Sequence, residues 1–246
     1  MTEPIDLTMV AYRRTGFTEQ ALWHLAERTR SPFRLTLVVN GWDELGEDEQ
    51  DMYLMAQNHG IIDHLVILSE NYGIHAAKNI CLPFIRSRYY VDFDNDILVP
   101  DLDPDWLTRM VDLMDGRPEY AAIAMRPQVF VGTDESKIDW SSGIADFPWV
   151  GACGRIMRTD LVKAAGGWRP VWDSKRNNEE RWICSKIKDL ADCKFGYSRD
   201  IRCYHLFGDD NWGYGDQPIE EHGHNPIWPP TSHYEREVDS KTFEPL

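Results

Sequence analysis

Three aspartates at alternate positions follow an apolar run near the middle of the chain. Residues 89–100 read YYVDFDNDILVP, so Asp92, Asp94 and Asp96 close a stretch of aromatic and β-branched side chains. A divalent cation needs several hard oxygen ligands, and a strand that ends where its carboxylates begin presents them at the rim of a sheet. This arrangement suits a metal-bridged diphosphate.

Two other interpretations of the aspartates are available. Asp and Asn favour turns, so the cluster can be ordinary solvated turn chemistry. An EF-hand calcium loop is the sharper alternative, because the aspartates match its first, third and fifth positions. However, Ile97 stands where that loop needs glycine, Pro100 falls at the ninth position, and Asp103 replaces the final glutamate. The EF-hand interpretation is therefore weak.

Strand-length apolar runs alternate with helical patterns before this cluster. The pattern predicts strands at residues 5–12, 33–39, 61–68 and 89–93, with a helix in each interval. Such alternation favours right-handed crossovers and a largely parallel sheet with helices on both faces, in which ligands bind beyond the carboxyl ends of the strands. We expect Gly41, Asn71 and Asp94 at that edge.

The second half of the chain is less regular. A helix capped by Asp103, with Pro104 in its first turn, should end at Gly116. The remaining expectations are a strand at 120–125, a loop at 133–147, a strand at 149–157, a helix from near Asn177 or Asn178, and two short strands ending at His205. The aromatic-rich residues 207–246 form either an ordered extension over the active face or a partly disordered tail.

Composition limits the class of protein. The chain has 246 residues and a net charge of −15, which argues against a broad grip on nucleic acid or an anionic membrane. Glu3, Pro4 and Asp6 interrupt any signal-peptide pattern, and no apolar segment approaches membrane-spanning length. Five scattered cysteines suggest reduced thiols. The expectation is a cytoplasmic protein without a transmembrane segment.

Residues 5–205 together resemble the family 2 glycosyltransferases of the GT-A fold. The resemblance rests on segments in the family's order: VAYRR, VVNG, NYGIHAAKN, DFDND, GACGRIM, AAGGW, NNEER and CYH. It implies an α/β, Rossmann-like three-layer sandwich with a largely parallel central sheet. It also implies one domain over residues 1–206, with the nucleotide-binding half at 1–100, the acceptor half at 101–206, and residues 207–246 as an extension near the active face.

The resemblance further implies an inverting hexosyltransferase-type enzyme. Such an enzyme moves a sugar from a nucleotide-diphosphate sugar to an acceptor hydroxyl, and Mn²⁺ or Mg²⁺ neutralises the charge that develops on the diphosphate. Asp94-Asn95-Asp96 then corresponds to the DxD motif, with Asp96 as a metal ligand and Asp94 nearer the ribose or the metal's waters. Asp92 is the alternative start of the motif. His205 matches a position that contacts metal or diphosphate in several GT-A enzymes, or it is structural.

The general base, on the same resemblance, lies in the pair Glu179-Glu180 at the start of a helix. Inversion needs a carboxylate that takes the proton of the attacking hydroxyl. Glu180 aligns better with this base, although the family commonly has Asp there. The alternative is that both glutamates only complement the helix dipole.

The resemblance also implies a set of nucleotide contacts. They are Ala11, Tyr12, Arg14, Asn40, Asn71, Gly73, Lys78, Asn79 and Asp94. Asn40 replaces an Asp that reads the base edge in the family, and Lys78 replaces an Arg and can face the diphosphate as a point charge. Trp168, Trp149 or Trp212 can stack on a sugar ring.

Two competing functions remain open at this point. A non-catalytic sugar- or metal-binding module would bind a ligand without consuming a nucleotide sugar. A sugar nucleotidyltransferase shares this kind of sheet, but it needs a GxGTRL-type loop where this chain has AYRRTGF. The sequence does not identify the donor, the acceptor or the oligomeric state.

Overall fold

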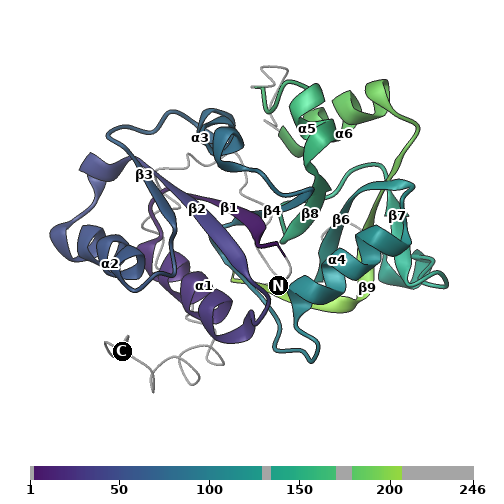
Figure 1. Cartoon of the computed structure of the whole chain (residues 1–246), viewed down its shortest axis with the longest axis horizontal. Helices are drawn as coiled ribbons and strands as arrows, with labels where there is room; N and C mark the ends of the chain where they lie inside the picture. The colour runs from purple at the N-terminus through teal and green to yellow at the C-terminus, as the bar shows by residue number, and fades with distance from the viewer. Residues whose placement is uncertain (1–2, 129–133, 170–178, 207–246) are drawn as a thin grey trace.

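Parallel strands form the frame of the molecule, and helices cover both faces of the sheet (Figure 1). The computed structural model describes residues 3–128, 134–169 and 179–206. The strands are β1 (Ile5–Ala11), β2 (Phe33–Asn40), β3 (His64–Leu68), β4 (Tyr89–Asp94), β5 (Ile97–Leu98), β6 (Tyr120–Pro127), β7 (Ile144–Phe147), β8 (Arg155–Arg158) and β9 (Lys194–His205). The α-helices are α1 (Thr15–Arg28), α2 (Glu47–Asn58), α3 (Ile74–Cys81), α4 (Trp106–Gly116), α5 (Thr159–Ala164) and α6 (Glu179–Leu190). Short 3₁₀ turns are η1 (Trp42–Glu44), η2 (Leu82–Phe84) and η3 (Glu135–Lys137).

The direction of the strands defines one functional edge. The nine-stranded sheet has the order β3-β2-β1-β4-β8-β6-β9-β5, and β7 also pairs with β9. Parallel pairing joins β1 to β2 and β4, β2 to β3, and β6 to β9, whereas β8, β5 and β7 pair antiparallel with their neighbours. Because β8 lies antiparallel between β4 and β6, strands β6 and β9 run in the same direction as β4. The expected α/β fold with a mostly parallel sheet is confirmed.

Apolar stripes on the helices make the two outer layers. Leu22 and Leu25 of α1 and Met110 of α4 belong to the core on one face of the sheet, together with side chains of α2. Ala77 of α3 and Ile183 of α6 belong to clusters on the other face, where α5 also packs. The spacing of these residues places each on one side of its helix, so burial of that side fixes the helix against the sheet. The three layers match the expected sandwich.

Strand β3 begins later than the sequence pattern indicates. Its expected start at residue 61 is wrong, because the backbone N–H groups of Ile61 and Ile62 donate to the Ala56 carbonyl at 3.0 and 3.4 Å. These bonds complete the turn that ends α2. The strand starts at His64, three residues further on.

Helix α4 is capped by a different aspartate from the one expected. Asp103 is not the cap; Asp105 is, and its carboxylate accepts the Thr108 N–H at 2.8 Å. The same carboxylate accepts the N–H groups of Arg30 and Ser31 at 2.5 and 2.6 Å, which ties α4 to the end of α1. Burial alone would raise the pKa of Asp105, but the hydrogen bonds outweigh burial and lower it.

The second half of the chain contains more strand than expected. The segment expected to be a loop at 133–147 includes β7, which pairs with β9. The two short strands expected before His205 are one strand of twelve residues. Ser198 lies in the stretch where the pairing of β9 with β6 is irregular, and its Oγ accepts the Ile201 N–H at 3.1 Å. The strand therefore continues through the expected break, and the Ser198 hydroxyl satisfies the Ile201 N–H there.

A tight turn shortens the strand expected at 149–157, so that β8 begins only at its seventh residue. Gly154 has φ 57°, and its N–H donates to the Ala152 carbonyl at 2.8 Å. This left-handed conformation favours glycine. The turn also places the Ala152 carbonyl 3.1 Å from the Asp94 N–H at the end of β4.

The expected C-terminal extension, residues 207–246, lies outside the described residues. Within the described residues, no helix combines the length and the apolar character needed to cross a membrane.

Candidate active site

The candidate site lies at the edge where the parallel strands end. Strand β1 ends at Ala11, β2 at Asn40, β4 at Asp94 and β9 at His205. Four residues selected from the sequence therefore share one edge of the sheet, and of these the strand pattern had predicted Asp94 there.

Just below this edge, Asp92 holds two buried cations. Lys78 Nζ lies 2.9 Å and Arg155 Nη2 lies 2.5 Å from the same oxygen, Asp92 Oδ2. The side chains of Lys78 and Asp92 are 2% exposed and that of Arg155 is 0% exposed. Burial would raise the pKa of Asp92, but the two cations outweigh burial and lower it. Lys78, expected at the diphosphate, faces Asp92 in this structure and lies 4.0 Å from Asp94 Oδ1.

Trp168 packs against the same cations. The centre of its ring lies 4.6 Å from the Arg155 guanidinium and 4.8 Å from Lys78 Nζ, within the range of a cation–π contact. Asn79, an expected nucleotide contact, instead binds the Trp168 backbone with both ends of its amide, at 2.6 and 2.7 Å. Trp168 is 2% exposed, so its ring is not open to stack on a sugar.

Asp96 lies between two basic groups. Arg14 Nη1 is 3.2 Å from Asp96 Oδ2, and His205 Nε2 is 3.1 Å from Asp96 Oδ1. Burial would raise the pKa of Asp96, but His205 and Arg14 lower it. Burial would lower the pKa of His205, yet Asp96 raises it to about 9. The pair is therefore an imidazolium and a carboxylate, and the structure brings Arg14, Asp96 and His205 together as a unit.

Asp94 and Glu180 are both anchored to Ala152. Glu180 lies in the first turn of α6, and its Oε1 accepts the Ala152 N–H at 2.8 Å. The Ala152 carbonyl accepts the Asp94 N–H. Burial raises the pKa of Glu180, although Arg155 and Lys78 oppose it. Glu179 occupies the same first turn and is half-buried.

Burial also raises the pKa of the Asp94 carboxyl. The positive charge of Lys78 lowers this pKa, whereas the carboxylates of Asp96 and Glu180 raise it further. The Asp94 side chain is nevertheless 37% exposed, the most open carboxylate of the three aspartates in this segment. Asp94 is therefore the carboxylate that a ligand at the edge reaches first.

The expected base-reading residue, Asn40, uses its amide within the protein. Asn40 Nδ2 donates to Asn71 Oδ1 at 2.8 Å, and Asn40 Oδ1 accepts the Tyr72 N–H at 2.9 Å. Asn71 Oδ1 also accepts the Gly73 N–H at 2.9 Å. Asn71 and Gly73 thus belong to one hydrogen-bonded turn before α3. Asn40, at the end of β2, holds this turn in position through its side-chain amide.

Tyr12 lies beside that turn. Its hydroxyl donates to Glu44 Oε2 at 3.1 Å, and a Cβ at Gly41 would come within 3.0 Å of its ring. Gly41 has φ 108° and leaves room for the ring. Tyr12 is half-buried at this edge, whereas Ala11, the residue before it, is fully buried.

Asp94 and Asp96 fit a divalent cation as a partial donor set. Mg²⁺ is usually held by one or two carboxylates together with substrate phosphates and water. In the described part of the chain, no cluster of three or more His, Cys, Asp or Glu side chains is arranged to hold a metal. A metal at this edge would therefore need further ligands from a diphosphate and water.

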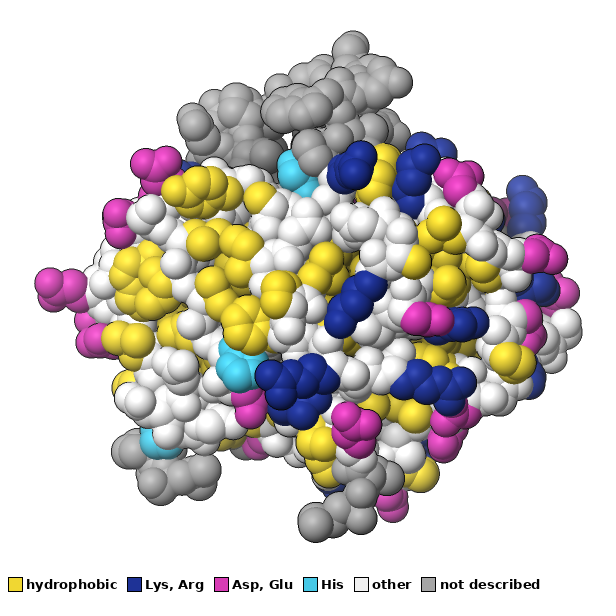
Figure 2. Space-filling view, turned by 45° about the horizontal axis from the view of Figure 1, so that its top comes forward, with side chains coloured by type: hydrophobic (Ala, Val, Ile, Leu, Met, Phe, Trp, Pro, Cys, Tyr) yellow, Lys and Arg dark blue, Asp and Glu magenta, His cyan; other side chains and the backbone are white. Residues whose placement is uncertain are grey.

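The surface charge is mixed. On the face shown in Figure 2, Lys and Arg side chains lie mainly in the centre and on the right, among acidic and apolar ones, and apolar side chains gather on the left. A continuous basic surface of the kind that grips nucleic acid is absent from this face.

Comparison with known proteins gives the family. The model described as Glycosyl transferase family 2 matches residues 6–203. No curated protein matches the sequence. The mannosyltransferase PcManGT from Pyrobaculum calidifontis, solved with GDP-Man and Mn²⁺, has a TM-score of 0.65 and 16% identity over 86% of this chain and 59% of its own. S. aureus TarS 1–349, solved with UDP-GlcNAc, has a TM-score of 0.59 and 15% identity over 82% of this chain and 58% of its own.

These structural likenesses show a shared fold, and this chain spans less than two thirds of each of these two structures. The family match runs from Asp6 in β1 to Cys203 in β9, so it includes Asp94, Asp96 and Glu180 and ends two residues before His205. This chain belongs to the family 2 glycosyl transferases.

Proposed function

We propose that this chain transfers a sugar, with inversion, from a nucleotide-diphosphate sugar to an acceptor hydroxyl, using a divalent metal. Membership of the family supports glycosyl transfer. Structures of the same fold bind GDP-Man with Mn²⁺ and UDP-GlcNAc, which supports a nucleotide-sugar donor. The observation that carries the proposal is the attachment of Asp94 and Glu180 to opposite sides of Ala152 at the carboxyl edge.

Glu180 is assigned as the general base. Its Oε1 is held by Ala152, while Oε2 makes no hydrogen bond within the described residues and can accept a proton. Burial raises the pKa of Glu180, so the carboxylate binds a proton more readily than an exposed glutamate does. The acceptor hydroxyl would lose its proton to Oε2 as it attacks the anomeric carbon.

Asp94 and Asp96 are assigned to the donor side. A divalent metal bound there would neutralise the charge that develops on the leaving diphosphate. Arg14 is 23% exposed, whereas Lys78 is 2% and Arg155 0% exposed, so Arg14 is the arginine or lysine of the site best placed to meet the diphosphate. His205 holds Asp96 in position through their ion pair.

The first test is donor turnover. The protein would be incubated with Mn²⁺ and a panel of nucleotide sugars that includes GDP-mannose and UDP-N-acetylglucosamine, and released nucleoside diphosphate would be measured. We expect release from at least one donor and its loss on addition of EDTA. If no donor is consumed although one raises the melting temperature, the protein is a binding module and the proposal fails.

The second test separates the two glutamates. Glu180→Gln should lower kcat by roughly 100-fold or more, because a positioned general base contributes about that much. The stabilisation of the protein by donor should persist, since Glu180 acts on the acceptor. Glu179→Gln is the matched control and should keep most of the activity. Full activity in Glu180→Gln would remove it as the base.

A further inference from the structure

The segment of residues 150–152, between β7 and β8, carries the backbone groups that hold Asp94 and Glu180. It contains neither helix nor strand, so no ladder of backbone hydrogen bonds fixes it. The Ala152 carbonyl accepts two backbone N–H groups, those of Asp94 and Gly154, at 3.1 and 2.8 Å. The Ala152 N–H binds the Glu180 carboxylate, so the position of this carboxylate depends on what holds the rest of the segment.

The residue before Ala152 is held by Tyr197. The Gly151 N–H donates to the Tyr197 hydroxyl at 2.8 Å, and both residues are buried. A Cβ built on Gly151 would stand 3.5 Å from the Tyr197 hydroxyl oxygen and 3.5 Å from Glu180 Oε1. The hydroxyl and the carboxylate therefore approach the same glycine from the side on which a Cβ would lie.

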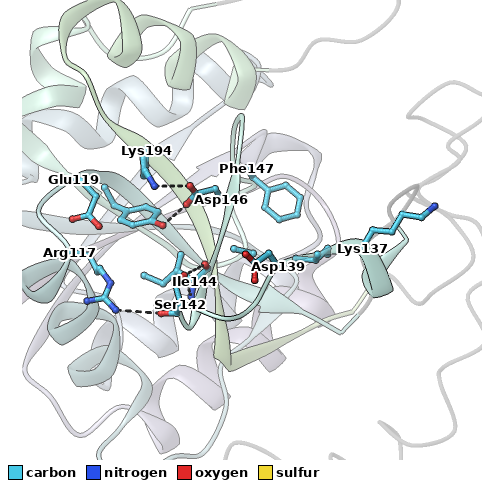
Figure 3. A pocket seen from close by; sticks show the side chains of 12 residues that line it. Arg117, Glu119, Lys137, Asp139, Ser142, Ile144, Asp146, Phe147 and Lys194 are labelled. Atoms are coloured by element: carbon cyan, nitrogen blue, oxygen red, sulfur yellow. Dashed lines mark hydrogen bonds and ion pairs between the residues drawn. The ribbon is translucent and has the colours of Figure 1, made fainter.

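Tyr197 is itself held by its neighbours in the sheet. Its backbone lies in β9 between two other strands, opposite Ala124 of β6 and Ala145 of β7. The ring of Phe147 meets the Tyr197 ring edge-on, with centroids 5.0 Å apart and planes at 85°. Figure 3, which is centred on a cavity beside β7, shows Phe147 on the other side of this strand from Asp146. Tyr197 is therefore a fixed point from which the segment 150–152 is held.

We propose that Tyr197 is a positioning residue for Glu180, acting through Gly151 and the Ala152 N–H. This assignment rests on the proposed function, in which Glu180 is the general base. The Tyr197 hydroxyl fixes Gly151, and the peptide group that joins Gly151 to Ala152 carries the N–H that binds Glu180. Because two backbone N–H groups hold the Ala152 carbonyl separately, loss of the hydroxyl should displace the base more than the donor-side aspartates.

The substitution Tyr197→Phe removes the hydroxyl and keeps the ring. The buried Gly151 N–H then loses its acceptor, so we expect the segment to shift. Release of nucleoside diphosphate would be measured with Mn²⁺ and GDP-mannose or UDP-N-acetylglucosamine, at a temperature where both proteins are folded. We expect kcat to fall about tenfold or more, because a general base out of line loses its effect, while the donor KM changes less than about twofold.

Hydrogen exchange followed by NMR tests the same link without any substrate. The Ala152 N–H is hydrogen-bonded to Glu180, so its exchange rate reports how firmly that bond is held. In Tyr197→Phe this amide should exchange about tenfold faster than in the wild type, because the residue before it is no longer held.

The matched control is Tyr120→Phe. This substitution also removes a buried tyrosine hydroxyl, the one that donates to Asp146. Tyr120 begins β6, whereas Met125, later in the same strand, donates its N–H to the Cys153 carbonyl beside Ala152. Tyr120→Phe should therefore keep the wild-type kcat and the wild-type exchange rate at Ala152.

A wild-type kcat in Tyr197→Phe would overturn the proposal, and so would an unchanged exchange rate at Ala152. Equal effects in Tyr120→Phe would show a general loosening of the sheet and overturn it too. The exchange measurement needs no donor, so it keeps this result separate from the proposed function. A wild type that consumes no donor, together with faster exchange in Tyr197→Phe, would contradict the transferase function and still support Tyr197 as the residue that positions Glu180.

Discussion

Asp92 and Asp94 are two residues apart on one strand and have different environments. Asp92 is enclosed and paired with Lys78 and Arg155, whereas Asp94 stands at the strand end with 37% of its side chain exposed. This difference in depth agrees with the preference for Asp94 over Asp92 in the sequence register, whereas Asp96, at 5% exposed, is nearly as enclosed as Asp92. Asp92 is more deeply buried than Asp94 because β4 ends at Asp94, two residues after Asp92.

Substitution of these two aspartates should separate stability from activity. Asp92→Asn leaves Lys78 and Arg155 buried without their carboxylate, and should lower the free energy of unfolding by about 3 kcal/mol or more. Asp94→Asn removes a carboxylate that crowds against Asp96 and Glu180 and should not lower stability, while donor turnover is lost. Urea unfolding in EDTA, alongside the turnover assay, measures both. Equal destabilisation by the two variants would contradict the assignment.

The partnership of Arg155 and Asp92 shows what a single sequence leaves hidden at this scale. Each charge interrupts an apolar run, which indicates a buried ionised group that needs a partner. The partners are 63 positions apart, and no local spacing connects them. Pairing of β4 with β8 places Asp92 opposite Arg155, so the pair depends on the register of the sheet.

At the level of elements, the Asp6 side chain joins β1 to the turn before β4 through hydrogen bonds. Its carboxylate accepts Arg34 Nε at 2.8 Å and the N–H groups of Arg86 and Ser87 at 2.6 and 2.7 Å. Burial alone would raise the pKa of Asp6, but these bonds outweigh it and lower the pKa. A depressed carboxylate pKa adds stability above the unfolded pKa, near 3.9, and that stability is lost as the pH falls below it.

Asp6→Asn should therefore destabilise the protein in a pH-dependent way. At pH 7 the loss should be about 1 to 3 kcal/mol, as expected for hydrogen bonds to a charged group. The difference from wild type should shrink as the pH falls below about 3.9, because Asp6 of the unfolded chain takes up a proton there, whereas folded Asp6, with its lowered pKa, does so only at lower pH. Urea unfolding at each pH measures the difference, with the exposed Asp51→Asn as control. A gap that stays constant down to pH 3 would refute the linkage.

The sequence predicted which helices and strands exist more accurately than it predicted the residues at which they begin and end. The first four strands and the helices between them follow from apolar periodicity, which is a local property. The cap of α4 does not, because Asp105 is selected partly by the N–H groups of Arg30 and Ser31. Strand β7 has only four residues and exists through its pairing with β9. The local apolar pattern did not predict features that depend on a partner distant in the sequence.

At the level of the whole molecule, strands from residues 1–100 and strands from residues 101–206 belong to one sheet. Strand β4 pairs with β8, and Ile97 of β5 pairs with His205 of β9. Division of the chain after residue 100 would expose an edge of β4 and leave Asp92 without Arg155. The two halves are regions of one folded unit on this reasoning.

A fragment of residues 1–100 should therefore fail to fold alone. We expect weak near-ultraviolet circular dichroism and no cooperative thermal transition, because the core loses α4, β6 and β8. The whole chain, measured under the same conditions, should show both signals. A fragment that melts cooperatively would show that residues 1–100 are an independent domain.

The position of Ala152 has a thermodynamic consequence. The Ala152 carbonyl accepts a hydrogen bond from the Asp94 N–H, and the Ala152 N–H donates one to Glu180 Oε1. Ordering of this residue by a ligand on either side reduces the conformational freedom that the other side must still lose. Such coupling is reciprocal, so an acceptor analogue should tighten donor binding by the same factor by which donor tightens the analogue. The two substrates would then bind more cooperatively than their direct contact alone provides.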